Sequence, residues 1–130
     1  MTMKIINTAQ APAPVGPYNQ AIAANGFLFT AGQIALDPQT MTIVGEGNVE
    51  AQAKQVLANL GAVLQEAGCG WENVVKTTVF LQDMNDFAAV NAIYAQYFDE
   101  AIAPARSCVE VARLPKDVLV EIDCVAVLPS

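Results

Sequence analysis

Arg106 is the residue whose type and surroundings point most directly to chemistry. It lies in the segment 104–109 (PARSCV), and no other charged residue occurs between Glu100 and Glu110. A guanidinium keeps its charge in apolar surroundings and so needs an anionic partner there, and its planar fork suits a carboxylate held by two parallel hydrogen bonds. Two interpretations are open: Arg106 binds the carboxylate of a small acid, or it forms a structural ion pair with Glu110 or Asp123.

Glu121 is a second charge in an unusual place, inside the apolar run 118–127. In an extended strand its side chain shares one face with Leu119, Asp123 and Val125. A partly desolvated glutamate has a raised pKa, which suits a general base that takes a proton from water and returns one to a leaving group. The alternative is the outward face of an edge strand, where two acids are unremarkable. Under the first interpretation, Arg106 holds an acid and Glu121 handles a proton, which together make a minimal active site.

Three further side chains are candidates for the same site. Asn91 is a polar residue on an otherwise apolar helical stripe, and a backbone-capping or intersubunit hydrogen bond is the alternative. Tyr18 has an aromatic body and a hydroxyl, which suits the mouth of a pocket, and core packing is the alternative. Cys108 lies two residues from Arg106 and therefore on the same strand face, although core packing as a reduced thiol is the ordinary expectation for all the cysteines of this chain.

Several classes of site are disfavoured by what the sequence lacks. It has no histidine, which removes Ser-His-Asp and Cys-His mechanisms and the commonest metal ligand. The acids show no ligand spacing and there is no glycine-rich nucleotide loop, so we expect neither a metal nor a cofactor. A net charge of −7 disfavours nucleic-acid binding. No apolar run reaches the roughly 18 residues of a membrane span, and the N-terminus lacks a signal-peptide stretch, so we expect no membrane contact and a cytoplasmic protein.

Turn residues and apolar periodicity predict eight regular elements. Asn25-Gly26 between two apolar segments is the preferred type I′ hairpin turn. Asn48 can cap a helix, and Pro104 prevents a second helix from continuing. In chain order the expected elements are strands 4–6, 21–24 and 27–30, a helix over 49–67, a strand over 74–81, a second helix from 85 or 86, and strands 107–112 and 118–127.

The order β-β-β-α-β-α-β-β predicts the α+β class, with one mixed β-sheet and two α-helices packed on one face. A length of 130 residues predicts a single domain over 1–130. The chain is 54% hydrophobic and only 15% charged, which is more apolar than a small monomer can easily hide. We therefore expect a homo-oligomer in which other copies of the chain cover the second face of the sheet.

Four parts of the sequence resemble the motifs of a known family. The segment 104–122 (PARSCVEVARLPKDVLVEI) is similar to the signature of the RidA (YjgF-type) family of reactive-intermediate deaminases. The segments 16–21 (GPYNQA) and 32–34 (GQI) resemble its first two motifs. The segment 76–81 (KTTVFL), with Asp86-Phe87 and Val90-Asn91 after it, resembles its central motif. The resemblance covers nearly the whole chain in register.

The resemblance implies a chorismate-mutase-like fold and a homotrimer with clefts between subunits. It also implies the 2-iminobutanoate/2-iminopropanoate deaminase reaction, in which reactive 2-imino acids released by pyridoxal-dependent dehydratases are hydrolysed to 2-oxo acids and ammonia without a cofactor. In the family, the arginine that matches Arg106 grips the substrate carboxylate, and the glutamate that matches Glu121 orients or activates water. The cleft is lined by the residues that match Tyr18, Gly32, Asn91 and Cys108.

Two departures from the family pattern bear on substrate range rather than on the reaction. Ala31 stands where many relatives have serine, and Ala103 stands where many have an aromatic residue. Two other functions stay open. One is a binding or sensor protein for small carboxylic acids that uses the same cleft. The other is an endoribonuclease or translation inhibitor, a role attributed to some relatives, which the net charge of −7 and the lack of histidine disfavour.

Overall fold

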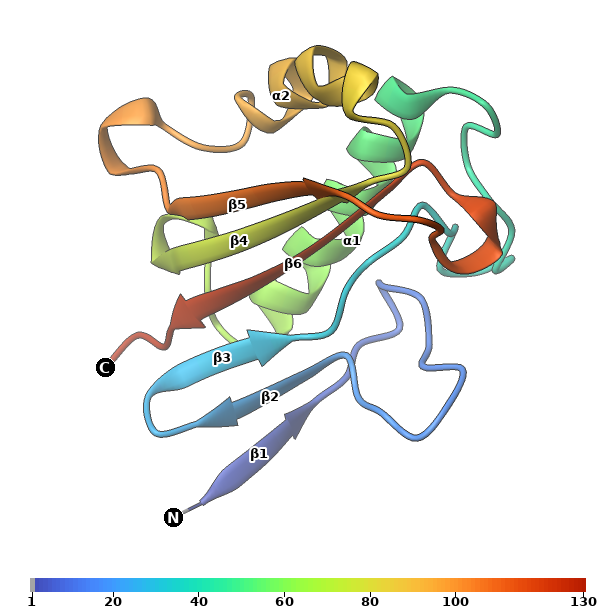
Figure 1. Ribbon diagram of the computed structural model, residues 1–130. Coiled ribbons are helices and arrows are strands. Elements are labelled where there is room, and N and C mark those ends of the chain that lie inside the picture. Colours follow the sequence, from blue (N-terminus) through green and yellow to red (C-terminus); the bar gives the residue numbers. More distant parts are fainter. Residues whose placement is uncertain (1) are drawn as a thin grey trace.

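A computed structural model describes residues 2–130 as one sheet covered by two α-helices (Figure 1). The order of strands and α-helices is β-β-β-α-β-α-β-β, as the sequence predicts. None of the helices in the described part of the chain is long and apolar enough to cross a membrane. The strands are β1 (Met3–Ile6), β2 (Ala21–Ala24), β3 (Phe27–Thr30), β4 (Val74–Leu81), β5 (Ala105–Glu110) and β6 (Val120–Val127), and the helices are α1 (Val49–Glu66) and α2 (Phe87–Tyr94).

The strands form one mixed sheet in the order β1-β2-β3-β6-β4-β5. β4 and β5 run parallel, and every other neighbouring pair is antiparallel. Figure 1 shows α1 and α2 on the same side of the sheet. The predicted α+β class, with both helices on one face, is therefore confirmed. The topology places β6, which carries Glu121, inside the sheet, and β5, which carries Arg106, at its edge.

Three local signals produce the structure that the sequence predicts. Asn25 and Gly26 have φ angles of 53° and 82°, the left-handed conformations that a type I′ turn between β2 and β3 requires. The side chain of Asn48 accepts a 3.0 Å hydrogen bond from the backbone N–H of Ala51 and so caps α1. Gly68, with φ of 79°, follows the end of the same helix in the conformation typical of helix termination.

Two strands differ from the prediction by two residues, and long-range contacts explain both. β5 covers Ala105–Glu110 rather than 107–112, because its parallel partner β4 ends at Leu81. β6 begins at Val120 rather than at residue 118. The preceding backbone still belongs to a turn, because the N–H of Leu119 donates to the side chain of Gln52 at 2.8 Å rather than to a strand.

The apolar core lies between the sheet and α1. Alternate residues of β4 and β6 point toward the helices, and Val79 and Ile122 are both buried. One polar pair lies in this layer, where the hydroxyls of Thr77 and Tyr94 are hydrogen-bonded at 2.8 Å. Because side chains alternate along a strand, this packing also decides which residues of β4 and β6 face the other side of the sheet.

On the face of the sheet opposite the helices, the part formed by β1, β2, β3 and the end of β6 is apolar. Ile5, Ile22, Phe29 and Val125 lie next to one another in register across four strands. Ile5 is 60% exposed and Phe29 is 48% exposed. A contiguous row of large apolar side chains open to solvent is typical of a protein–protein interface.

Candidate active site

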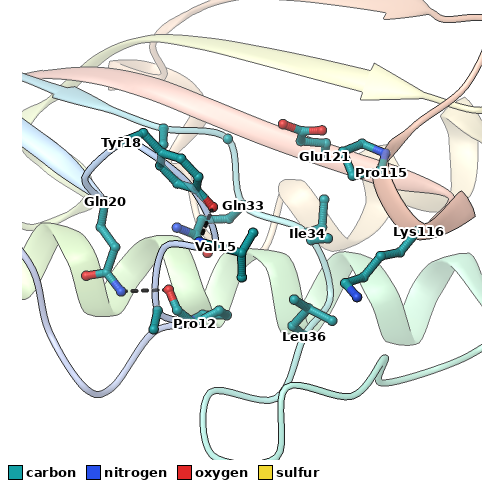
Figure 2. A pocket seen from close by; sticks show the side chains of 13 residues that line it. Pro12, Val15, Tyr18, Gln20, Gln33, Ile34, Leu36, Pro115, Lys116 and Glu121 are labelled. Atoms are coloured by element: carbon teal, nitrogen blue, oxygen red, sulfur yellow. Dashed lines mark hydrogen bonds between the residues drawn. The ribbon is translucent and has the colours of Figure 1, made fainter.

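A cavity of about 390 Å³ opens where the N-terminal loop, the segment after β3 and the start of β6 meet. In Figure 2, Tyr18 lines one side of this cavity and Lys116 the other, with Glu121 between them at the rim. Gly32, in the segment after β3, lies directly against the Glu121 side chain. The cavity therefore brings together three residues that the sequence singles out, Tyr18, Gly32 and Glu121.

The N-terminal wall of the cavity is held by the buried side chain of Gln20. Its amide oxygen accepts from the backbone N–H of Thr8 at 2.6 Å, and its amide nitrogen donates to the carbonyls of Ala11 at 3.1 Å and Pro12 at 2.8 Å. The backbone carbonyl of Gln20 also accepts from the N–H of Ala31 at 2.9 Å. One residue thus ties the loop that carries Tyr18 to the segment that carries Gly32.

Two buried amides of α1 hold the remaining walls. The side chain of Asn59 donates to the carbonyls of Ile34 at 3.1 Å and Leu36 at 2.9 Å, and both of these residues line the cavity. Gln52 accepts the N–H of Leu119 just before β6. Sequence reasoning missed these bracing roles. The sequence did contain a sign that these two amides are buried. Gln52 and Asn59 each lie three or four residues from apolar residues of the same helix, which places them on its apolar face.

Glu121 is half-buried on the open face of a central strand, so the interpretation as an edge-strand acid is wrong. Burial raises the pKa of its carboxyl group, and the nearby charge of Asp123 raises it further. Gln33 and Ile122 exchange backbone hydrogen bonds of 2.9 and 3.2 Å, which fix the preceding Gly32 against the carboxylate. A half-buried carboxylate with a raised pKa is suited to accept and return a proton near neutrality.

Tyr18 is not a core residue, since it is 48% exposed and lines the cavity. Its hydroxyl accepts a 3.3 Å hydrogen bond from the backbone N–H of Val15, drawn as a dashed line in Figure 2. The ring is thereby held beside the opening, where its face and its hydroxyl are available to a ligand.

Arg106 lies at a second and more open cavity, of about 740 Å³. It donates a 2.7 Å hydrogen bond to the side-chain oxygen of Asn91. Its guanidinium carbon lies 4.8 Å from the ring centre of Tyr94 and 5.4 Å from that of Phe87. The structural ion pair with Glu110 or Asp123 is not formed, because among residues 2–130 the one ion pair within 4.0 Å joins Arg113 and Asp117. The fork of Arg106 is held in place without a neutralising partner.

The structure shows the side-chain partner of Asn91 and the position of Cys108. Among residues 2–130, the side chain of Asn91 bonds to Arg106, which it orients, and not to backbone. The intersubunit hydrogen bond of Asn91 stays a prediction. Cys108 is paired with Val79 of β4, and its side chain lies on the helix-facing side of the sheet, as does that of Arg106, which is paired with Thr77. The Cys108 side chain is half-buried and lines neither cavity. Burial raises the pKa of its thiol, and the charge of Arg106 partly opposes this. Cys69 and Cys124 are buried free thiols, as expected.

Within one chain, Arg106 and Glu121 lie too far apart to share a small ligand. Arg106 is opposite Thr77 and Glu121 is opposite Phe80, so three residues along β4 and two strand spacings separate their backbones by roughly 14 Å. The two side chains also lie on opposite faces, because Arg106 bonds to α2 whereas Glu121 faces away from the helices. Five of the candidate residues therefore fall into two separate groups, here called half-sites: Tyr18, Gly32 and Glu121 in one, and Asn91 and Arg106 in the other. No cluster of metal-ligating side chains is found among residues 2–130.

Comparisons with known proteins connect the chain to one family. A RutC family protein of Synechocystis sp. is 94% identical over 130 residues, covering 100% of both chains. A Mus musculus protein named 2-iminobutanoate/2-iminopropanoate deaminase is 50% identical over 124 residues, covering 95% of this chain and 90% of its own.

Solved structures show the same fold. Escherichia coli TdcF with bound serine has a TM-score of 0.88 and 48% identity, covering 95% of this chain and 98% of its own. A Rid family protein of unknown function from Yersinia pestis has a TM-score of 0.93 and 48% identity, covering 97% and 99%. A family model described as Endoribonuclease L-PSP matches residues 8–128. The chain belongs to this family, the RidA (YjgF-type) family that its motifs resemble, and has its chorismate-mutase-like fold.

Proposed function

We propose that this protein is a hydrolytic deaminase of 2-imino acids, converting them with water to 2-oxo acids and ammonia, and that 2-iminobutanoate and 2-iminopropanoate are among its substrates. The observation that carries the proposal is the chemistry of the two half-sites. One presents an unneutralised guanidinium, and the other a half-buried carboxylate whose pKa is raised. Relatives at about 50% identity bear the name of this deaminase.

The two half-sites have different roles in the proposed reaction: one binds the substrate and the other transfers protons. Arg106 holds the substrate carboxylate through paired hydrogen bonds, while Asn91 keeps its fork oriented. Glu121 takes a proton from water as the water oxygen bonds to the imine carbon, the C=N electron pair moves to nitrogen, and Glu121 gives that proton to the nitrogen, which leaves a carbinolamine. Glu121 then moves the hydroxyl proton to the nitrogen, the C–N bond breaks with its electron pair on ammonia, and the oxygen becomes the carbonyl of the 2-oxo acid. Because an imine is already electrophilic, these steps call for no cofactor.

The opposite placement of the half-sites supports active sites between subunits, and the resemblance to the family implies that the assembly is a homotrimer. Burying the apolar face that includes Ile5 and Phe29 against another copy brings a second chain over the face that carries Glu121. We propose that Arg106 of one subunit meets Glu121 of the next. Sedimentation should then give three times the 13.7 kDa chain mass. The three free thiols suit a reducing, cytoplasmic compartment.

The activity is tested by competition with a trap. An amino-acid oxidase generates the imine, semicarbazide captures it, and a deaminase lowers the amount of semicarbazone formed. Wild-type protein should suppress the trapped product, and Arg106→Ala should not. Equal trapping with and without wild-type protein, for every imine tried, would show that the protein is not a deaminase.

The shared site is tested by mixing two variants, one without activity (Arg106→Ala) and one with strongly reduced activity (Glu121→Gln). Arg106→Ala chains keep Glu121, and Glu121→Gln chains keep Arg106. Random reassembly of equal amounts makes three quarters of the trimers mixed, with one intact cleft in three, so about a quarter of wild-type activity should return if the site spans two subunits. No recovery in verified mixed trimers would place both groups of a site on one chain. Arg106→Ala mixed with the double variant is the control and should remain inactive.

The family's description gives a specific reason to test a second function. It names an endoribonuclease, although a net charge of −7 opposes binding to a phosphate backbone. A gel-shift assay with RNA at moderate salt, followed by analysis of the RNA for cleavage, separates the two functions. A third outcome, binding of 2-oxo acids by calorimetry with no turnover by wild type, would indicate a sensor of small acids.

A further inference from the structure

The cavity beside Glu121 ends at a cation that the reaction does not use. Lys116 lies in the turn Pro115–Asp117 between β5 and β6 and lines the cavity. Glu121 and Lys116 are the charged residues among those lining it. Lys116 forms no ion pair within 4.0 Å among residues 2–130. Figure 2 shows its side chain on the same side as Ile34 and Leu36, with the ammonium group turned away from the Glu121 carboxylate.

The turn that carries Lys116 is braced in an unusual conformation. Lys116 and Asp117 have φ angles of 55° and 56°, in the left-handed region that residues other than glycine seldom adopt. The guanidinium of Arg113 donates two hydrogen bonds to the Asp117 carboxylate, of 2.7 and 3.2 Å. The N–H of Val118, a fully buried residue, closes the turn on the carbonyl of Pro115 at 3.2 Å. These contacts hold the backbone of Lys116 at the cavity, while its ammonium group stays accessible to a ligand.

The walls between the two charges are apolar and rigid. Ile34 and Leu36 line this part of the cavity, and the buried amide of Asn59 fixes their carbonyls. A volume of about 390 Å³ lies within the range of small-molecule sites, whereas 2-iminopropanoate has only six heavy atoms. The cavity therefore has room for a side chain that extends beyond the reacting carbon.

We infer that this cavity is the subsite for the substrate side chain, and that Lys116 selects side chains that end in a carboxylate, as in the imine of glutamate. The inference rests on the proposed deaminase function. With the α-carboxylate on Arg106 of the neighbouring subunit and the imine carbon at Glu121, the methylene groups lie along Ile34 and Leu36. The terminal carboxylate then meets the Lys116 ammonium. A local cation also offsets the repulsion of a dianion by a chain of net charge −7.

The test compares the imines of glutamate and leucine, each made by a suitable oxidase and followed by the trap. For Lys116→Gln, the ratio of kcat/KM for the glutamate imine to that for the leucine imine should fall about fivefold, the size expected for one solvent-accessible ion pair. Added salt should lower the same ratio in wild type. Lys116→Arg should restore the ratio. Lys54→Gln, which removes the same charge from an exposed position of α1 outside the cavity, should leave it unchanged.

Each result decides between the proposals. Lys116→Asn repeats the test with a residue that tolerates left-handed φ, and circular dichroism verifies the fold of each variant. If wild type hydrolyses the leucine imine but both Lys116 variants keep the wild-type ratio, or if Lys54→Gln lowers it equally, the subsite inference is wrong and the deaminase function stands. The subsite inference also fails if wild type does not act on the glutamate imine. If wild type acts on neither imine, the proposed function itself is in doubt.

Discussion

Replacing Gly32 by alanine should disable Glu121 without unfolding the protein. A methyl group at position 32 would lie 2.8 Å from the carboxyl carbon of Glu121 and 3.0 Å from its γ-carbon, and closer still to one carboxylate oxygen. Carbon atoms in ordinary contact are about 3.5–4.0 Å apart. The φ angle of Gly32 lies outside the left-handed region, so alanine fits the backbone itself. The Glu121 side chain must therefore give way, by roughly 1 Å.

That displacement sets the expected magnitude. A misplacement of about 1 Å at a reacting group costs roughly 100-fold in rate, which corresponds to about 2.7 kcal/mol in the activation free energy. The free energy of unfolding should change by less than about 1 kcal/mol, because a shifted rotamer and the reduced entropy of the unfolded chain act in opposite directions. Gly32→Ala should thus separate activity from stability.

The assay is a double-mutant cycle in the imine trap, with urea unfolding in parallel. If Gly32→Ala acts through Glu121, it should lower kcat/KM about 100-fold in wild type and less than about threefold in Glu121→Gln. Gly16→Ala is the matched control, since a methyl group there meets the Tyr18 ring at an ordinary 3.7 Å. An equal loss in both backgrounds, or full activity of Gly32→Ala, would refute the assigned role of the glycine.

Three further predictions concern the other parts of the site. Arg106→Ala should abolish the acceleration of imine hydrolysis. Arg106→Lys should restore only part of it, because an ammonium group cannot form the two parallel hydrogen bonds that a guanidinium makes to a carboxylate. KM and kcat from the trap assay measure both effects. Activity should fall as the pH drops through the raised pKa of Glu121, since the base must be ionised; this fall is the acid limb of the pH profile. Asp123→Asn should move the acid limb to lower pH, because the charge of Asp123 raises the pKa of Glu121. A profile of kcat/KM against pH measures both effects. Gln20→Leu should lower the free energy of unfolding by about 2–3 kcal/mol, because buried backbone groups lose their partner; urea unfolding measures it.

Each of these has a contrary result. Arg106→Ala with wild-type KM and kcat would remove the arginine from the site. An acid limb that stays in place, or moves to higher pH, in Asp123→Asn would show that the limb belongs to a group other than Glu121. A urea midpoint for Gln20→Leu equal to that of wild type would mean that water satisfies the loop carbonyls as well as the amide does.

The sequence by itself determined the features that depend on neighbouring residues. Asn25-Gly26 sets the hairpin turn because these residues tolerate left-handed φ, and Asn48 starts α1 because its side chain satisfies a free N–H. The element order follows from periodicity for the same local reason. Arg106 and Glu121 were recognisable because each is an isolated charge in an apolar segment. Burying such a charge without a partner costs free energy, so its presence indicates a binding or catalytic role.

Only the tertiary structure decided which of these residues meet. Strand order and register depend on pairing between distant segments, so the sequence could not show that β6 is central or that Arg106 and Glu121 lie on opposite faces. It could not show that Asn91 orients Arg106, or that Lys116 shares a cavity with Glu121. The physical reason is that local propensities act over a few residues, whereas burying α1 against one face of the sheet fixes the direction of every strand side chain at once.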